Sequence, residues 1–269
     1  AINRVEEHLS ENETLMCLGE IVHNDAEVNR LKDKGLHVID ADNFKSLKNK
    51  RVFFRAHGEP PESYKIAKQN NLQIIDATCP IVLMLQSKIR KKYQEIKPIN
   101  GQIVIFGQRG HAEVIGLNGN ANNEAIIVSS KDDLKNIDYS LPVALFSQTT
   151  KSNDEYLKIV DEIKSRMKNE YFFYLNSICK QVTNRNKNLF TFCKDKDLII
   201  FVGGKQSSNA KSLFSLCRQA NERVFFVSEI SQIKKEWFLN VKSVGITGAT
   251  STPKWQMENV KGYITELCK

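Results

Sequence analysis

Short apolar runs alternate with more polar stretches along almost the whole chain. The first such runs lie at residues 14–18, 36–39, 51–55 and 72–75. Runs of four or five apolar residues bounded by turn signals favour buried strands. The stretch at about 25–34 and the one that opens at Pro60 and Pro61 favour helices. Because strands alternate with helices, the pattern predicts an α/β fold with parallel sheets.

The same order of elements recurs twice. The second round has apolar runs at 102–106, 125–128, 143–146 and 171–175, and the third has them at 198–202, 224–227 and 241–246. A repeat of about 95 residues predicts three pseudo-symmetric α/β units, with mostly parallel sheets, around a central cavity. We expect the three units to span residues 1–79, 80–179 and 180–269.

The chain starts with a helical pattern and not with a methionine. Ala1, Ile2, Val5 and Leu9 have the spacing of one helix face. The third round also stops after its last helix, without the closing strand of the first two rounds. In a cyclic arrangement, a segment upstream of Ala1 would supply that strand. We therefore expect an N-terminally truncated form, whose third unit is completed by a missing N-terminal segment.

The composition is that of an ordinary globular protein with a basic charge. Of the 269 residues, 41% are hydrophobic, and the apolar runs are far shorter than the roughly 20 residues that span a bilayer. No membrane partner is therefore expected. The net charge of +8 suits an anionic ligand or an acidic protein partner. Nucleic acid is the weaker interpretation, because the lysines are spread along the chain and no basic stripe is interleaved with aromatic residues.

The cysteines point to metal binding more than to disulfides. The chain has 6 cysteines and no CxxC pair, so neither a disulfide framework nor a zinc finger is expected, and the compartment is predicted to be reducing, that is, cytoplasmic. Cys79 and Cys179 each follow a predicted strand and lie 100 residues apart, at one position of the repeat. Taken singly, each could be a small buried hydrophobic residue. Their shared position favours thiolate ligands, with a third cysteine expected upstream of Ala1.

Three thiolates without a fourth would suit an iron–sulfur cluster that leaves one iron open to a substrate. The other four cysteines are interpreted as packing or surface residues, because they lie inside predicted strands or helices: Cys17, Cys193, Cys217 and Cys268. The Gly203-Gly204-Lys205 segment does not predict a nucleotide-binding P-loop, since Gln206 stands where Ser or Thr is required.

Small polar residues and histidines follow the predicted strands at two further positions of the repeat. One position holds His23, His111 and the Ser207-Ser208 pair, with Asn209 beside it, and the other holds His57, Thr149 and Ser251. In parallel sheets, ligands bind beyond the carboxyl ends of the strands. Hydroxyl, amide and imidazole donors near helix N-termini would suit a phosphate group. The alternative is that the serines and the asparagine are plain helix N-caps.

Glu113 lies two residues after His111, in a loop placed at the same cavity. A carboxyl group shielded from water can act as a proton donor. The alternative is a solvated loop glutamate. Standing alone, Glu113 would favour the second interpretation.

These segments together resemble the LytB/IspH family of 4-hydroxy-3-methylbut-2-enyl diphosphate reductases. The resemblance covers essentially the whole chain and is carried by Ile21-Val22-His23-Asn24, Ala56-His57-Gly58, Asp76-Ala77-Thr78-Cys79-Pro80, Gly110-His111-Ala112-Glu113, Ser147-Gln148-Thr149-Thr150, Ile178-Cys179, Ser207-Ser208-Asn209 and Ser251 with Pro253. It implies a three-domain α/β protein with a 4Fe-4S cluster. The reaction it implies is the last step of the methylerythritol phosphate route, a two-electron reductive dehydroxylation that gives isopentenyl and dimethylallyl diphosphates.

The resemblance also implies roles for individual residues. Cys79 and Cys179 match cluster ligands, and the catalytic residues are Glu113 as proton source, His111 and Thr149. The substrate-binding residues implied are His23, His57, His111, Gln148, Thr149, Ser207, Ser208, Asn209 and Ser251. A ferredoxin or a flavodoxin would supply the electrons.

The sequence departs from the family pattern at three points. The first family cysteine is absent, Ala112 replaces the usual proline, and Val182 occupies a position that is often threonine. The second hypothesis is therefore a non-catalytic diphosphate-binding fragment that lacks the full cluster.

Overall fold

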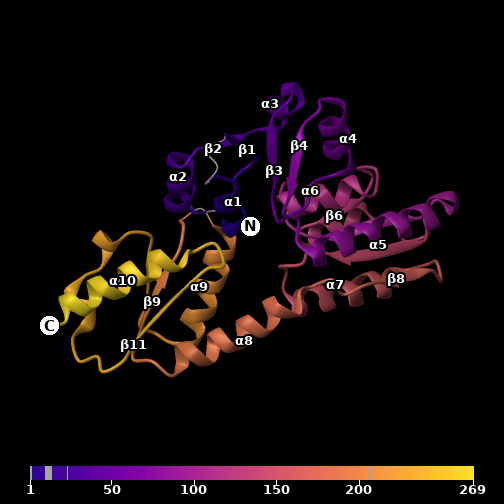
Figure 1. The fold of residues 1–269 in the computed structure, drawn as a ribbon. Coiled ribbons are helices and arrows are strands. Elements are labelled where there is room, and N and C mark those ends of the chain that lie inside the picture. The colour runs from indigo at the N-terminus through magenta and orange to yellow at the C-terminus, as the bar shows by residue number, and fades with distance from the viewer. Residues whose placement is uncertain (1, 10–13, 23, 206) are drawn as a thin grey trace. The chain divides into compact units, whose positions relative to one another are not determined.

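The computed structural model describes residues 2–9, 14–22, 24–205 and 207–269, without the side chains of Thr183 and Ser208. These residues form three separate sheets, with strand orders β2-β1-β3-β4, β6-β5-β7-β8 and β10-β9-β11 (Figure 1). Every described strand pair is parallel. The first three strands of each round occupy the same order in their sheet. This confirms the predicted α/β fold with repeated parallel sheets.

The first sheet is built from four short strands, β1 (Leu15–Leu18), β2 (Leu36–Ile39), β3 (Arg51–Phe54) and β4 (Gln73–Asp76). Helices α1 (Ile2–Leu9), α3 (Ala41–Ser46) and α4 (Pro61–Gln69) belong to the same part of the chain. The polar segment after β2 folds as α3. It does so because Asp40 caps the helix at Asn43 and Phe44 is buried in the core beside Phe54.

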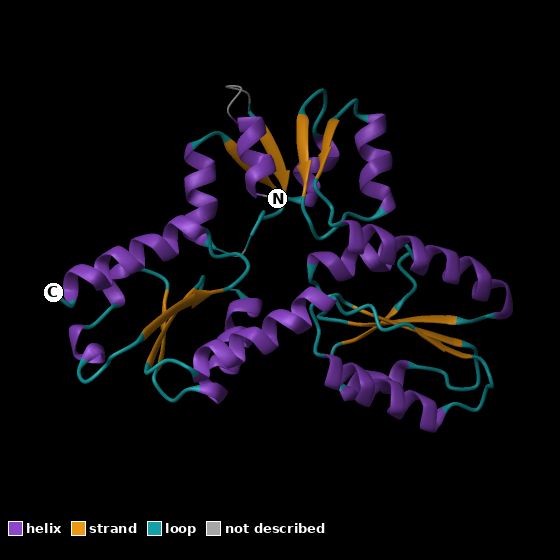
Figure 2. Cartoon of the chain, turned by 60° about the horizontal axis from the view of Figure 1, so that its bottom comes forward, coloured by secondary structure: helices purple, strands orange, loops and turns teal. Residues whose placement is uncertain are grey.

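The second sheet contains β5 (Gln102–Phe106), β6 (Ile126–Val128), β7 (Val143–Ser147) and β8 (Phe172–Tyr174). Its helices are α5 (Pro80–Ile96), η1 (Lys97–Ile99), α6 (Ala112–Gly119), η2 (Lys131–Asn136) and α7 (Asn153–Arg166). Residues of α7 pack on one face of this sheet, and residues of α5 and α6 pack on the other. Figure 2 shows helices on either side of the strands. A strand buried on both faces reads as a continuous apolar run, as β7 does.

The third sheet contains β9 (Leu198–Val202), β10 (Val224–Val227) and β11 (Val244–Gly248). Its helices are α8 (Lys180–Lys194), α9 (Ser208–Ala220), η3 (Ile230–Gln232), η4 (Lys235–Phe238) and α10 (Lys254–Leu267). Residues of α8 and α9 share one core cluster with β9, and residues of α10 share another. The third sheet thus repeats the layers of the second, without a fourth strand among the described residues.

The chain divides into two compact units. The first comprises Ala1–Gly19 and Leu36–Thr183 and holds the first two sheets, and the second comprises Glu20–Gly35 and Asn184–Lys269 and holds the third sheet. Helix α2 (Asp25–Asp33) belongs to the second unit, although it lies between two strands of the first sheet in the sequence. The boundaries at residues 79 and 179 separate the three sheets, and as domain boundaries they stay a prediction. None of the described helices is both long and apolar enough to span a bilayer.

Candidate active site

The two candidate cluster cysteines are preceded by the same kind of turn. The side-chain oxygen Oδ1 of Asp76 accepts the backbone N–H of Thr78 at 2.9 Å. One hundred residues later, Oδ1 of Asn176 accepts the backbone N–H of Ile178 at 3.2 Å. Asp and Asn favour such turns because their side chains reach the backbone two residues on. The repeat seen in the sequence is therefore a repeat of local structure as well.

Backbone hydrogen bonds fix each cysteine beside a neighbouring strand end. The N–H of Cys79 donates to the carbonyl of Ala56 at 3.1 Å, and the N–H of Cys179 donates to the carbonyl of Thr149 at 2.9 Å. Both cysteines are half-buried and not in a disulfide. Helices α5 and α8 begin at the next residue. Each thiol therefore lies where the end of a strand meets the N-terminus of a helix.

The cysteines interpreted as packing or surface residues differ in their surroundings. Cys17, Cys193 and Cys217 are buried, and Cys268 is exposed. Burial raises the pKa of the Cys17 thiol to about 12 and also raises the pKa of the Cys193 thiol. A thiol that resists ionisation is a poor metal ligand. The geometry thus agrees with a packing role for these three residues.

Glu113 is a buried carboxylate and not a solvated loop residue. Its side chain is in the first turn of α6 and is 2% exposed. Its Oε1 accepts the backbone N–H of Thr149 at 2.7 Å, and its Oε2 accepts the Thr149 hydroxyl at 2.9 Å. Burial raises the pKa of Glu113, while the two hydrogen bonds from Thr149 act in the opposite direction. A carboxyl group in this setting can hold a proton nearer to neutral pH than an exposed one.

His111 precedes Glu113 and caps α6. Its Nδ1 accepts the backbone N–H of Glu113 at 3.1 Å. A ring whose Nδ1 is an acceptor carries its proton on Nε2, so a neutral His111 presents an Nε2–H donor. Helix α6 begins at Ala112, the residue that replaces the usual family proline. The side chain of His111 supplies the cap at this position.

His57 and His111 meet although they are 54 residues apart in the sequence. Their rings are perpendicular, with centroids 5.4 Å apart. The approach depends on two glycines: a Cβ on Gly116 would lie 2.3 Å from the carbonyl oxygen of Gly58, and Gly58 has a φ of +78°. Only glycine allows both the close packing of α6 and the left-handed turn without strain. The loop after β3 and the start of α6 therefore form one imidazole pair.

Gln148 is placed beside Thr149 but is already engaged within the protein. It is 3% exposed. Its Oε1 accepts the N–H of Gln108 at 3.0 Å, and its Nε2 donates to the Thr150 hydroxyl at 2.9 Å. Its side chain therefore connects the loops that follow β5 and β7 through hydrogen bonds. A substrate role for Gln148 stays a prediction.

The second unit gathers polar residues at the ends of β9 and β11. The buried hydroxyl of Ser207 accepts the N–H of Ala210, so Ser207 is also the N-cap of α9. Asn209 donates to the Thr250 hydroxyl at 3.3 Å. Among the described residues, the buried Oγ of Ser251 has no hydrogen-bond partner. A buried hydroxyl in this state is ready to donate to an oxygen of a ligand.

Two of the predicted substrate residues, His23 and Ser208, are not fully described by the structure. His23 lies outside the described residues, and only the backbone of Ser208 is described, at the start of α9. Neighbouring Asn24 caps α2 and donates to the side chain of Gln256 at 3.0 Å. Asn24 is thus bonded within the second unit.

Several residues of the site were not expected from the sequence. Asp76 accepts three hydrogen bonds, from the Thr78 backbone, the Thr78 hydroxyl and the Tyr64 hydroxyl. Arg185 donates to the carbonyl of Gly248 at 2.8 Å and also bonds the Thr250 hydroxyl. The signal for Asp76 was available, because an Asp or Asn three residues before each cysteine is part of the repeat. Arg185 has no such counterpart.

The residues present fit part of an iron–sulfur site. The first unit offers two thiolates at equivalent turns, and the described residues contain no group of three or more His, Cys, Asp or Glu side chains able to hold a metal ion. A cluster with three thiolates therefore needs one ligand from outside the described residues.

Comparison with known proteins identifies the family. The sequence model of the LytB protein matches residues 1–265. A 4-hydroxy-3-methylbut-2-enyl diphosphate reductase from Parabacteroides distasonis is 49% identical over 99% of this chain and 92% of its own length. A reductase of the same name from Bacteroides thetaiotaomicron is 48% identical over 100% of this chain and 93% of its own length. These shares give no support to the expectation of an N-terminally truncated form.

Two solved structures have the same fold. One, described as (E)-4-hydroxy-3-methyl-but-2-enyl diphosphate reductase, the terminal enzyme of the non-mevalonate pathway, has a TM-score of 0.76 at 31% identity and covers 98% of this chain and 93% of that one. The other, the E-1-hydroxy-2-methyl-but-2-enyl-4-diphosphate reductase from Plasmodium falciparum, has a TM-score of 0.82 at 30% identity, over 98% of this chain and 82% of that one. By sequence and by fold, the chain belongs to the LytB family of 4-hydroxy-3-methylbut-2-enyl diphosphate reductases.

Proposed function

We propose that the strand-end residues described above carry out the family's reaction on a 4Fe-4S cluster. The chain is an oxidoreductase, a 4-hydroxy-3-methylbut-2-enyl diphosphate reductase, and acts at the end of the non-mevalonate route to isoprenoids. Two electrons and two protons are consumed, the allylic C–O bond breaks, and water leaves. The products are isopentenyl and dimethylallyl diphosphates. The observation that carries the assignment of residues is the buried Glu113–Thr149 pair.

Cys79 and Cys179 are proposed as two ligands of the cluster. When bound, the cluster supplies the two electrons and an open iron that acts as a Lewis acid toward the hydroxyl oxygen. The third thiolate is assigned to a cysteine upstream of Ala1, and this assignment remains a prediction. The two equivalent turns support the proposal because they place both thiols at strand ends, each next to a helix N-terminus.

Glu113 is proposed as the residue that delivers a proton to the departing hydroxyl. Its burial disfavours the carboxylate, so the group can be protonated and ready to donate. Thr149 holds both carboxyl oxygens, which leaves the group oriented in one direction. His111, bonded to the backbone of Glu113, is proposed to donate from Nε2 to an oxygen of the substrate.

The diphosphate is proposed to bind through hydroxyl, amide and imidazole donors that follow the strands. The residues are His23, His57, His111, Gln148, Thr149, Ser207, Ser208, Asn209 and Ser251. Hydroxyl, amide and imidazole groups donate to phosphate oxygens, and the N-terminus of α9 adds a favourable dipole. The buried Ser251 hydroxyl, which has no partner among the described residues, supports this assignment.

The electrons are proposed to come from a ferredoxin or a flavodoxin, small acidic proteins that suit the net charge of +8. The six unpaired cysteines are compatible with a reducing compartment, and we place the chain in the cytoplasm.

The test is anaerobic iron–sulfur reconstitution of this chain, and of the same chain with a cysteine-bearing segment added upstream. Iron content, absorption and EPR spectra are measured, followed by turnover of the allylic diphosphate with reduced methyl viologen. We expect a cluster and both products from the extended chain. If the extended chain takes up no cluster, the proposed site is wrong. If the extended chain binds the diphosphate but takes up no cluster and cannot be reduced, the protein is a non-catalytic diphosphate-binding fragment instead.

A further inference from the structure

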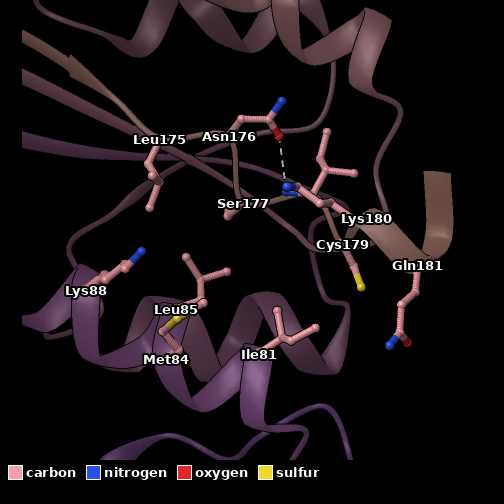
Figure 3. A pocket seen from close by; sticks show the side chains of 11 residues that line it. Ile81, Met84, Leu85, Lys88, Leu175, Asn176, Ser177, Cys179, Lys180 and Gln181 are labelled. Atoms are coloured by element: carbon pink, nitrogen blue, oxygen red, sulfur yellow. Dashed lines mark hydrogen bonds between the residues drawn. The ribbon is translucent and has the colours of Figure 1, made fainter. Parts of the chain in front are cut away.

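A cavity in the first unit borders one of the candidate cluster ligands. A cavity of about 370 Å³ lies between α5 and the segment from Leu175 to Gln181, all within the first unit. Cys179 is part of its lining. Figure 3 shows Ile81, Met84 and Lys88 of α5 on one side of the cavity, and Cys179 and Lys180 on the other. The cavity thus lies directly beside a candidate cluster ligand.

The lining of the cavity combines apolar side chains with positive charge. Met84 is 52% exposed and Ile81 is half-buried, although α5 also packs against a sheet. Two lysines, Lys88 and Lys180, belong to the lining, and no acidic residue does among those that line it.

Helix α5 adds further positive charge beside the cavity. This helix carries Lys88, Arg90, Lys91 and Lys92 against one acidic residue, Glu95. Glu95 is already paired with Lys92 and with the Tyr171 hydroxyl. An acidic partner would therefore meet an uncompensated positive surface beside the cavity.

We propose that this surface, defined by Ile81, Met84, Lys88 and Lys180 around the cavity, is the docking site of a small acidic electron-transfer protein. The proposal rests on the proposed function, because Cys179 must hold a cluster for electrons to enter there. Transient redox complexes bury little area, so a few exposed apolar residues with complementary charge suffice. The lysines orient the carrier, and the apolar residues bring its redox centre close to the Cys179 wall.

The test compares two reductants of the reconstituted chain with the cysteine-bearing segment added upstream, which is called the unaltered chain below. Reduced methyl viologen is small and needs no docking, whereas a reduced acidic 2Fe-2S ferredoxin must bind. Lys88→Glu tests the charge and Met84→Ser tests the apolar contact. We expect each to lower the ferredoxin-supported rate by about tenfold at low salt and to leave the viologen-supported rate unchanged. Raising the salt concentration should shrink the difference between Lys88→Glu and the unaltered chain.

The matched control is Lys158→Glu. Lys158 is an exposed lysine on α7, the helix that packs on the opposite face of the same sheet. The charge change is identical, so the control should keep both rates. A loss in the control equal to that in Lys88→Glu would assign the effect to net charge and overturn the proposal.

Measuring ferredoxin binding directly distinguishes a wrong docking site from a wrong assignment of the function. The affinity of the ferredoxin is measured by calorimetry against the unaltered chain and both variants. Ferredoxin affinities and rates that stay within about twofold in both variants overturn the docking site. Absent viologen-supported turnover in the unaltered chain would instead count against the proposed function, and weaker ferredoxin binding by the variants would still support the docking site. A dimer that Met84→Ser abolishes would assign the surface to a second copy of the chain.

Discussion

The carboxylate of Glu113 is held by both hydrogen-bond donors of Thr149, its backbone N–H at 2.7 Å and its hydroxyl at 2.9 Å. The two residues come from different elements, the first turn of α6 and the loop after β7. The pair therefore joins the two loops that carry the catalytic candidates. Burial raises the pKa of Glu113, and the hydrogen bonds from Thr149 act to lower it.

Glu113→Gln should leave the fold and the cluster intact and abolish most turnover. Glutamine has nearly the same shape but cannot deliver a carboxyl proton. General acids contribute about 100-fold to 10,000-fold to a reaction rate, so the loss in kcat should fall in that range. Iron content and kcat are measured on the same preparation.

Glu170→Gln is the control for Glu113→Gln, because Glu170 is exposed and lies outside the candidate site. It should retain the unaltered rate. A near-normal rate in Glu113→Gln would remove Glu113 as the proton source.

Thr149→Val should shift the pH dependence of the reaction in a defined direction. The substitution deletes the hydroxyl that bonds the Glu113 carboxylate, and this bond is one of the two influences that lower the pKa. The pKa of Glu113 should therefore rise further. A proton donor is active while protonated, so the alkaline limb of the profile of kcat/KM against pH should move to higher pH.

Thr149→Ser retains the hydroxyl and should leave that limb in place. A limb that moves to lower pH in Thr149→Val would contradict the assigned hydrogen bond. An unchanged limb would show that Glu113 is not the group whose titration is observed.

The repeat carried most of the predictive power of the sequence. Strand-length apolar runs predicted the succession of strands along the chain, and the shared position of Cys79 and Cys179 is matched by the turns at Asp76 and Asn176. Such features are local, because a turn residue and the backbone it bonds are close in the sequence. They can therefore be inferred without the fold.

What the sequence did not reveal depends on long-range packing. The burial of Glu113 and its bonds to Thr149 join positions 36 residues apart, and no pattern distinguishes them from a solvated loop glutamate. Arg185 was missed because its partners, Gly248 and Thr250, lie more than 60 residues away. Helix α5 is different, because the spacing of Val82, Leu85 and Ile89 is that of one buried helix face and can be read from the sequence.

Asp76→Ala should weaken both the fold of the first unit and the cluster. Asp76 accepts three hydrogen bonds that fix the turn before Cys79, two from Thr78 and one from Tyr64. Leaving these donors without an acceptor costs about 1–3 kcal/mol in the free energy of unfolding. Urea unfolding and iron bound per chain are measured together.

Asp76→Asn should be milder, because Asn176 forms the equivalent turn with an amide oxygen. Asp42→Ala serves as the control: Asp42 is exposed and paired only with exposed Lys45, so its loss should cost less than about 1 kcal/mol. If Asp76→Ala binds iron as well as the unaltered chain, Asp76 does not position Cys79.

Arg185→Gln should weaken the binding of inorganic pyrophosphate by about tenfold, since charge-assisted hydrogen bonds are stronger than neutral ones. The guanidinium bonds the carbonyl of Gly248 and the hydroxyl of Thr250, just before Ser251. Its loss removes both the positive charge and the support of this loop. Calorimetry of pyrophosphate binding gives the measurement, with exposed Lys187→Gln as a control of equal charge change on the same helix. Equal affinities in the two variants would contradict a specific role for Arg185.

Gly116→Ala and Gly262→Ala should change stability in opposite directions. A Cβ at Gly116 would lie 2.3 Å from the carbonyl oxygen of Gly58, so α6 must move away from the loop that carries His57. Overpacking of this kind costs about 1–3 kcal/mol. A Cβ at Gly262, inside α10, meets nothing within 4 Å, and alanine there should stabilise the helix by about 0.5–1 kcal/mol.

Urea midpoints give both values, and kcat should fall only in Gly116→Ala, because only that change disturbs the imidazole pair. A stable, fully active Gly116→Ala would show that the contact between α6 and the loop after β3 does not position His57.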